Sequence, residues 1–286
     1  MMQRRMEASP TSMDPQAHTD EAGRKPWTWI LPDGHASNDW VHYRSRLETA
    51  AAHRGFDSTT LGTIGGEPLL MLRTGSTKPR APRLMLASGF HGEEPAGPWA
   101  VLDFLETAPR EFLAGVQLTV LPLVNATGFR AGTRFNAFGE NPNRGYLGLP
   151  GESPSQEGRQ LLAHGELLLD AARDGLLTCH EDVLLSQCYI YSNERTAAPT
   201  AFSDALIGAN SAFFPVHPDG TVDGCPVAGG IVFNHYDGSF ESWLMERGAA
   251  RIACVETPGQ QPIGRRIAAQ RAMIEAFIAC APPTGV

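Results

Sequence analysis

The sequence lacks the features that mark membrane proteins and disulfide-bonded proteins. No apolar run approaches the ~20 residues that cross a bilayer. The basic residues at the N-terminus are not followed by the apolar core of a secretory signal. The 286 residues include only five cysteines, an odd number with no CxxC pair. We therefore expect reduced thiols, a cytoplasmic location and no membrane partner.

Basic charge is also scarce. Lys and Arg together number 23 against 31 Asp and Glu, which gives a formal net charge of −8. Proteins that bind nucleic acid or anionic membranes usually have the opposite balance, so we expect neither as a partner. Apolar residues make up 42% and charged residues 19% of the chain, which is typical of a globular enzyme and excludes a disordered chain.

No internal repeat or low-complexity run divides the chain, and its length allows one large α/β domain or two small ones. Residues 1–26 are polar and rich in Pro, Ser and Asp, which predicts a disordered leader. We expect residues 27–286 to form a single catalytic domain.

Strand-like and helix-like segments alternate along this domain. The pattern predicts helices over 40–54, 95–105, 155–173, 239–246 and 264–280. It predicts strands over 83–87, 116–124, 176–180, 188–191, 229–234 and 251–256, with a hairpin over 59–74 and a long loop over 125–153. The expected fold is α/β, with a mixed, largely parallel β-sheet and helices on both faces. In such sheets, functional sites gather at the carboxyl ends of the strands.

The segment SGFHGEEPAG, residues 88–97, follows the first predicted core strand. His91 and Glu94 lie three residues apart in the turn that leaves it. An imidazole and a carboxylate at this spacing can bind one small cation. A capped turn with a solvated carboxylate would show the same two residues, so the pair does not establish a metal site by itself.

Two more polar residues end predicted strands. His180 ends strand 176–180 and Glu256 ends strand 251–256. A catalytic zinc takes three protein ligands and keeps one open position, which two histidines and a carboxylate satisfy. A buried Glu256 needs a partner or a task, and general-base catalysis beside a metal is such a task. The alternatives are a core histidine bonded to backbone and a glutamate that reaches solvent.

The loop over 125–153 contributes Arg134 and Arg144. Two arginines on one constrained loop above a sheet edge make an anion subsite, because the planar guanidinium grips a carboxylate in a bidentate way. It can also stabilise a developing oxyanion. Surface arginines on a mobile loop are the alternative.

A nucleophilic pair of Cys179 and His180 is a competing interpretation. Adjacent residues on a strand point to opposite faces of the sheet, so the two side chains would not meet. We therefore predict that Cys179 belongs to the core.

Four motifs occur in a recognisable order. They are HGEE at 91–94, GTRFNAFGENPNR at 132–144, CHED at 179–182 and CVETPG at 254–259. Together they resemble the carboxypeptidase A-like zinc metallopeptidases, and most of all the bacterial cytosolic branch that includes the murein peptide amidases. The resemblance extends over roughly residues 80–280.

The resemblance implies one Zn²⁺ per chain, with His91, Glu94 and His180 as its ligands. Glu256 is implied as the catalytic acid/base that assists the attack of a zinc-bound water.

The same resemblance implies that Arg134 polarises the scissile carbonyl and that Asn143 and Arg144 bind the terminal carboxylate of the substrate. Tyr236 is a candidate for the mobile substrate-binding tyrosine of the family, although a solvated loop tyrosine would look the same.

The chain departs from the family pattern at Asn141, where an aspartate usually orients a zinc-binding histidine. A neutral amide accepts a hydrogen bond more weakly, which lowers the expected metal affinity. Pro142 also stands where an aliphatic residue is usual.

The expected function is a zinc metallocarboxypeptidase or amidase that acts on a small peptide. The alternative is a deacylase of N-acyl amino acids, like aspartoacylase or succinylglutamate desuccinylase. Those relatives carry an extra β-domain after the catalytic glutamate, whereas only residues 257–286 follow Glu256 here, which favours the first reading. A third reading, a binding protein that has lost activity, rests only on Asn141.

Overall fold

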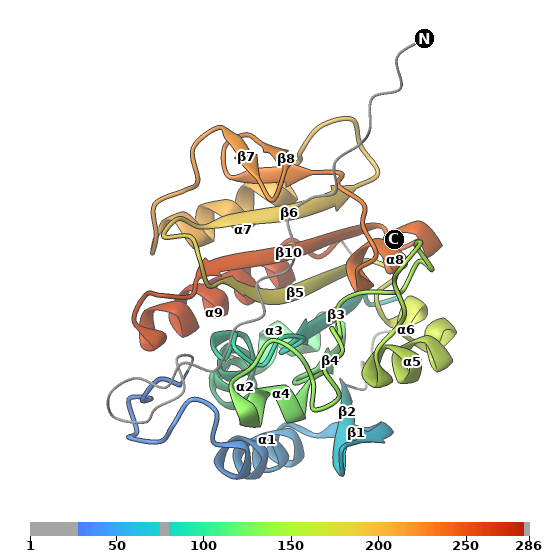
Figure 1. Cartoon of the computed structure of the whole chain (residues 1–286), viewed down its shortest axis with the longest axis vertical. Helices are drawn as coiled ribbons and strands as arrows, with labels where there is room; N and C mark the ends of the chain where they lie inside the picture. Colours follow the sequence, from blue (N-terminus) through green and yellow to red (C-terminus); the bar gives the residue numbers. More distant parts are fainter. Residues whose placement is uncertain (1–27, 75–79, 283–286) are drawn as a thin grey trace.

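The computed structural model describes residues 28–74 and 80–282. These residues form one mixed α/β domain, as predicted (Figure 1). The predicted leader, residues 1–26, lies outside the described residues.

An eight-stranded sheet runs through the domain in the order β1-β2-β4-β3-β5-β10-β6-β9. Its strands are β1 (Phe56–Ile64), β2 (Glu67–Thr74), β3 (Arg83–Ser88), β4 (Gln117–Leu121), β5 (Gly175–Asp182), β6 (Tyr189–Glu194), β9 (Ile231–Phe233) and β10 (Arg251–Pro258). The central strands β4, β3, β5 and β10 are parallel, whereas β1, β2 and β6 pair with antiparallel neighbours. The prediction of a mixed, largely parallel sheet is confirmed.

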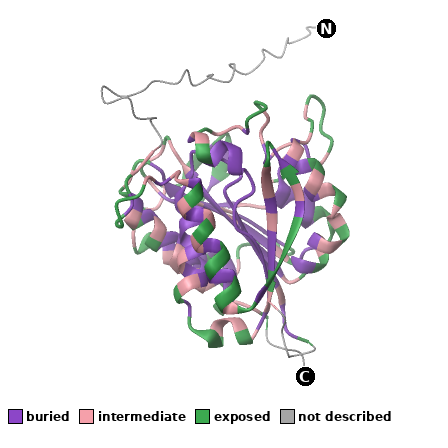
Figure 2. Cartoon of the chain, turned by 90° about the horizontal axis from the view of Figure 1, so that it is seen from below, coloured by how far each residue is buried: buried purple, intermediate pink, exposed green. Residues whose placement is uncertain are grey.

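Helices cover both faces of this sheet, which Figure 2 shows as a buried layer of strands between two helical layers. One face packs against α1 (Trp40–Arg54), α2 (Ala96–Thr107), α7 (Ala201–Ser211) and α9 (Ile263–Ala279). The other packs against α5 (Gln156–Ala163), α6 (Gly165–Ala171) and α8 (Phe240–Arg247). Short helices α3 (Arg110–Ala114) and α4 (Ala126–Ala131) and a separate hairpin, β7 (Gly220–Val222) with β8 (Cys225–Val227), complete the described elements. None of the helices in the described ranges is long and apolar enough to cross a membrane.

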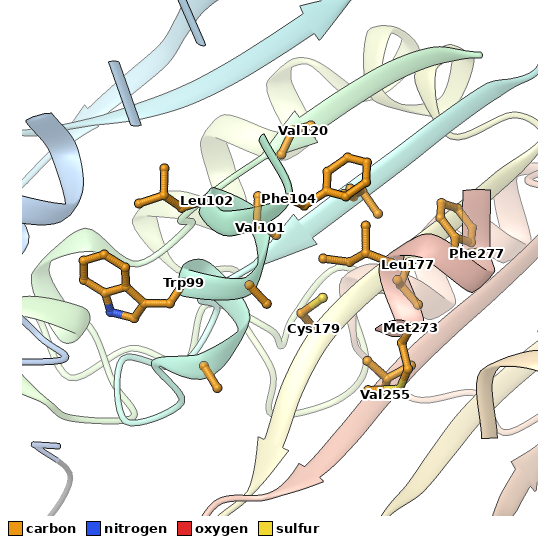
Figure 3. Close-up of a cluster of buried hydrophobic side chains, with 14 of the residues drawn as sticks. Trp99, Val101, Leu102, Phe104, Val120, Leu177, Cys179, Val255, Met273 and Phe277 are labelled. Carbon is orange, nitrogen blue, oxygen red and sulfur yellow. The ribbon is translucent and has the colours of Figure 1, made fainter. Parts of the chain in front are cut away.

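The main core lies between the sheet and the α2–α9 layer, where Cys179 and Val255 pack with Met273 and Phe277 (Figure 3). Cys179 and Val255 are register partners on β5 and β10. Burial raises the pKa of the Cys179 thiol to about 12, so it stays protonated and unreactive. The prediction that Cys179 is a core residue is confirmed. Because side chains alternate along a strand, the next pair, His180 and Glu256, faces the opposite side.

Two predicted elements differ from the structure. The helix expected over 155–173 is divided into α5 and α6, with His164 between them. A Cβ atom at Gly165 would lie only 3.2 Å from the Trp243 ring, so α6 begins on a glycine that packs closely against α8. The loop expected over 125–153 contains α4, which Asn125 caps by accepting a hydrogen bond from the Gly128 N–H at 2.8 Å.

A buried ion pair joins the end of β5 to α9. Arg266 donates to Glu181, and both side chains are at most 1% exposed. The second oxygen of Glu181 accepts from the Ala96 N–H at the start of α2, at 2.7 Å. The backbone N–H of Glu181 donates to Glu94 at 3.2 Å. The pair therefore fixes three elements directly beneath the residues predicted to bind metal.

Replacing Arg266 by Ala should lower the free energy of unfolding by about 3–5 kcal/mol, because it leaves the Glu181 carboxylate buried without its partner. Urea denaturation of the variant measures this loss. The matched control is Arg265→Ala, which removes an exposed guanidinium that lies 5.1 Å from the Phe214 ring and should cost ~1 kcal/mol or less. Equal losses in the two variants would contradict the role of the ion pair.

Candidate metal centre and active site

Three residues predicted as metal ligands meet at the carboxyl ends of β3 and β5. The Glu94 carboxylate lies between two imidazoles, with Oε1 2.7 Å from His91 Nδ1 and Oε2 2.9 Å from His180 Nδ1. All three residues are at most 4% exposed. The turn that carries His91 and Glu94 packs so closely that a Cβ atom at Gly92 would lie 1.9 Å from the Gly128 carbonyl carbon. A glycine is therefore required there.

The donor set of this cluster fits a small cation. One ligand atom from each residue lies within 4.8 Å of the others, and two nitrogens with one carboxylate oxygen are ligands that zinc prefers. Burial alone would raise the pKa of Glu94, but the two imidazoles hold it well below its ordinary value. Burial lowers the pKa of His91 to about 4, which keeps this ring in the neutral form that binds metals.

His180 lies in a more negative environment than His91. Burial alone would lower its pKa, but the carboxylates of Glu94 and Glu241 outweigh that effect and raise it to about 10. Two buried carboxylates against one imidazole require a positive charge, and either a proton or a metal cation can supply it.

The outer nitrogens of both rings face a side-chain oxygen. His91 Nε2 lies 3.2 Å from Asn141 Oδ1, so Asn141 occupies the orienting position that the sequence predicted for it. His180 Nε2 lies 3.5 Å from Glu241 Oε1.

Glu256 lies beside the metal cluster because β10 pairs with β5 in parallel register, with Glu256 opposite His180. Burial raises the pKa of its carboxyl group well above the ordinary value. The Cys254 thiol, two residues earlier on the same face, lies 3.7 Å from Glu256 Oε1. A raised pKa makes the carboxylate a stronger base toward a neighbouring proton donor.

Arg134 reaches the same cluster from the loop after α4. Its Nη1 lies 3.4 Å from Glu94 Oε1 and 3.5 Å from Glu93 Oε1. Burial, with the neighbouring charge of Glu94, raises the pKa of Glu93 to about 7. Sequence reasoning missed Glu93, although the doubled glutamate in the HGEE motif is a visible signal for it.

Asn143 and Arg144 differ in how far they are already engaged. The Asn143 amide accepts from the Phe240 N–H at 2.9 Å and donates to Glu241 Oε2 at 3.1 Å, and these two bonds join the loop to α8. Arg144 donates to the Asn143 carbonyl at 2.7 Å and lies 3.3 Å from Asp237 Oδ2. Its side chain is 39% exposed.

Several of the side chains described above line one cavity of about 480 Å³. Its lining includes the predicted residues His91, His180, Glu256, Arg134, Asn143 and Arg144. Tyr236 is 45% exposed and lies between the lining residues His235 and Asp237 without lining the cavity itself. The lining also includes Asp223 and Cys225 from the β7–β8 hairpin. No sequence pattern points to these two residues, because none predicts the hairpin.

Comparison with known proteins gives two kinds of match. A family model described as the succinylglutamate desuccinylase/aspartoacylase catalytic domain matches residues 80–172. That range holds His91, Glu94 and both loop arginines but ends before His180 and Glu256. The search of curated proteins found no match.

Several solved structures are similar over nearly the whole chain. A "putative metallopeptidase" from Shewanella amazonensis is 46% identical, with a TM-score of 0.86 that covers 90% of this chain and 98% of that one. One of the same description from Shewanella denitrificans is 44% identical, with a TM-score of 0.84, and covers 89% and 96%. A metallo-carboxypeptidase from Burkholderia cenocepacia is 17% identical with a TM-score of 0.62, covering 84% and 68%, and shares the fold.

The purified protein should bind one zinc ion per chain, and both His91→Ala and His180→Ala should release it, because each removes one of three ligands. Inductively coupled plasma mass spectrometry measures the zinc content after dialysis. His164→Ala is the matched control, since the ring of this half-buried histidine, just after α5, hydrogen-bonds to the Gln160 carbonyl and lies outside the cavity. Unchanged zinc in the His91 and His180 variants would place the metal elsewhere.

Proposed function

This chain belongs to a family of metallopeptidases with the carboxypeptidase A-like fold, and we propose that it is a zinc-dependent hydrolase. It would cleave the amide bond next to a free terminal carboxylate of a small peptide. The observation that supports this most is the shared cavity. Two histidines, a carboxyl group with a raised pKa and two arginines line it. Glu94, the third candidate ligand, contacts both histidines.

His91, Glu94 and His180 would hold the zinc ion. When bound, zinc supplies a Lewis acid that polarises the substrate carbonyl and makes water a better nucleophile at neutral pH.

Glu256 is positioned to move the proton. Its carboxylate takes a proton from the attacking water and passes it to the nitrogen of the leaving amine. Arg134, which is within 3.5 Å of both Glu93 and Glu94, donates to the oxygen on which negative charge develops.

Arg144 and Asn143 bind the substrate carboxylate in this proposal. Arg144 is the partly exposed cation of the pair, and its guanidinium exchanges the contact with Asp237 for the substrate. Asn143 Nδ2 has two hydrogens, of which Glu241 takes one. Tyr236, on the adjoining loop, closes over the bound substrate.

A second candidate is a deacylase of N-acyl amino acids. The desuccinylase/aspartoacylase model over residues 80–172 favours it. Both substrate classes place a free carboxylate one carbon from the scissile amide nitrogen, so the same arginine serves either. The reading as an inactive binding protein is disfavoured, because all three ligands and Glu256 are present. All five cysteines are free in the structure, which supports a cytoplasmic location.

The two candidate activities differ in the acyl group that is removed from the amino acid, which is a peptide in the first and a small acid such as acetate or succinate in the second. We expect the zinc-loaded protein to release amino acids from short peptides with free C-termini and not from the matching C-terminal amides. A fluorogenic amine assay measures this release. Hydrolysis of acetyl- or succinyl-amino acids without hydrolysis of peptides would instead establish the deacylase.

Glu256→Gln should lower kcat by about 10²- to 10⁴-fold because it removes the proton acceptor, while zinc content stays at one per chain. Steady-state kinetics and metal analysis of the same sample check both parts. Glu194→Gln, which makes the same change in a buried carboxylate of β6 that does not line the cavity, is the matched control and should turn over like the wild type. An active Glu256→Gln variant would remove this residue from the mechanism.

Arg144→Ala should raise KM by about 10- to 100-fold for substrates with a free carboxylate, because it removes a charge-assisted hydrogen bond. Arg144→Lys should recover part of the loss, since it keeps the charge without the fork. KM values for free and amidated substrates measure the effect. An equal loss on both would show that Arg144 does not bind the carboxylate.

A further inference from the structure

The two metal-binding imidazoles have unequal support on their outer sides. When Nδ1 of a histidine binds a cation, the proton of the ring is on Nε2, and that N–H needs an acceptor. The acceptor fixes the orientation of the ring and makes it a stronger ligand. The acceptors of His91 and His180 therefore bear on how tightly the site holds zinc.

His91 has a neutral and shared acceptor. Asn141 Oδ1 lies 3.2 Å from His91 Nε2, but the same oxygen also accepts from the Asn143 N–H at 2.9 Å. An amide oxygen that already accepts one hydrogen bond gives the imidazole little additional basicity.

His180 faces a carboxylate instead. Glu241 Oε1 lies 3.5 Å from His180 Nε2, and both side chains are at most 6% exposed. Among the described residues, none forms a hydrogen bond with His180 Nε2, although this nitrogen is buried. Glu241 is therefore the anion positioned to accept its proton.

The structure holds Glu241 in this orientation from two sides. Thr178, two residues before His180 on the same face of β5, donates its hydroxyl to Oε1 at 2.5 Å. Asn143 donates to Oε2 at 3.1 Å. Glu241 also lies in the first turn of α8, where the helix dipole favours a negative charge. Because each of its oxygens accepts a hydrogen bond, the Glu241 carboxylate is held in the orientation that faces His180.

We infer that Glu241 is a positioning residue of the metal centre, which holds His180 through Nε2 and supplies the negative outer partner that Asn141 does not give to His91. This inference rests on the proposed metal centre.

The same atoms suggest one other arrangement. Nε2 of His180, a Glu241 oxygen and the Cys254 thiol lie within 4.8 Å of one another, so they form a second group of possible ligands. If zinc is already bound to Nδ1, a second cation there would require His180 to lose its last proton and bridge two metals. A cation there alone would leave Nδ1 protonated toward Glu94 Oε2, 2.9 Å away. Both Glu241 oxygens already accept hydrogen bonds, which favours the positioning role.

The test measures zinc affinity of the metal-free protein by competition with a chromophoric chelator, so that it does not depend on turnover. Glu241→Gln should weaken zinc binding by about 10- to 100-fold. Thr178→Val, which removes only the orienting hydroxyl, should weaken it less. Adding Asn141→Asp to Glu241→Gln should recover much of the affinity, because it returns a carboxylate to the outer side of the cluster.

Glu194→Gln is the matched control. Glu194 is also a buried carboxylate that accepts from a backbone N–H and from hydroxyl groups, Thr200 and Ser203, but it contacts neither imidazole. The zinc affinity of the Glu194→Gln variant should equal that of the wild type.

Wild-type affinity in Glu241→Gln, an equal loss in Glu194→Gln, or a loss that Asn141→Asp leaves unrepaired would overturn the inference. Two zinc ions per wild-type chain, one of them lost in Cys254→Ala, would also overturn it in favour of the bridging arrangement. A wild-type protein that binds no zinc would instead refute the proposed function itself.

Discussion

The rest of the site depends on the contacts that the buried Glu94 carboxylate makes with two imidazoles. This carboxylate joins the turn after β3 to the end of β5, and its charge keeps His180 in a strongly negative environment. Burying such a group is costly unless a positive charge compensates it. Arg134 supplies part of that charge at 3.4 Å, and the donor set is suited to a metal cation for the remainder. The need to compensate this buried negative charge therefore links the packing of the strands to the proposed metal binding.

Strand alternation separates chemistry from packing at this point. On β5 and β10, Cys179 and Val255 enter the core, while the next register pair, His180 and Glu256, faces the cavity. The buried pair of Glu181 and Arg266 then fixes the end of β5 from below. A shift of one residue in this register would exchange the two faces, so the packing of the core determines where the candidate catalytic groups lie.

Much of this arrangement could be predicted from the sequence, because it follows from local patterns. Apolar runs that end in His or Glu located both sides of the metal cluster, and strand alternation placed Cys179 correctly. The hairpin that carries Asp223 and Cys225 could not be predicted, since its two strands have three residues each, too few to show an alternation of apolar and polar residues. The contacts of Glu241 were also beyond reach, because they depend on how α8 packs against the loop of Asn143.

The most direct test of the central claim is a crystal structure of the protein grown with zinc, with anomalous data collected at the zinc edge. We predict one anomalous peak about 2.0–2.2 Å from Nδ1 of His91, Nδ1 of His180 and an oxygen of Glu94, the distances that zinc takes to such ligands. A peak on Nε2 of His180 with Glu241, or none at the cluster, would contradict the account.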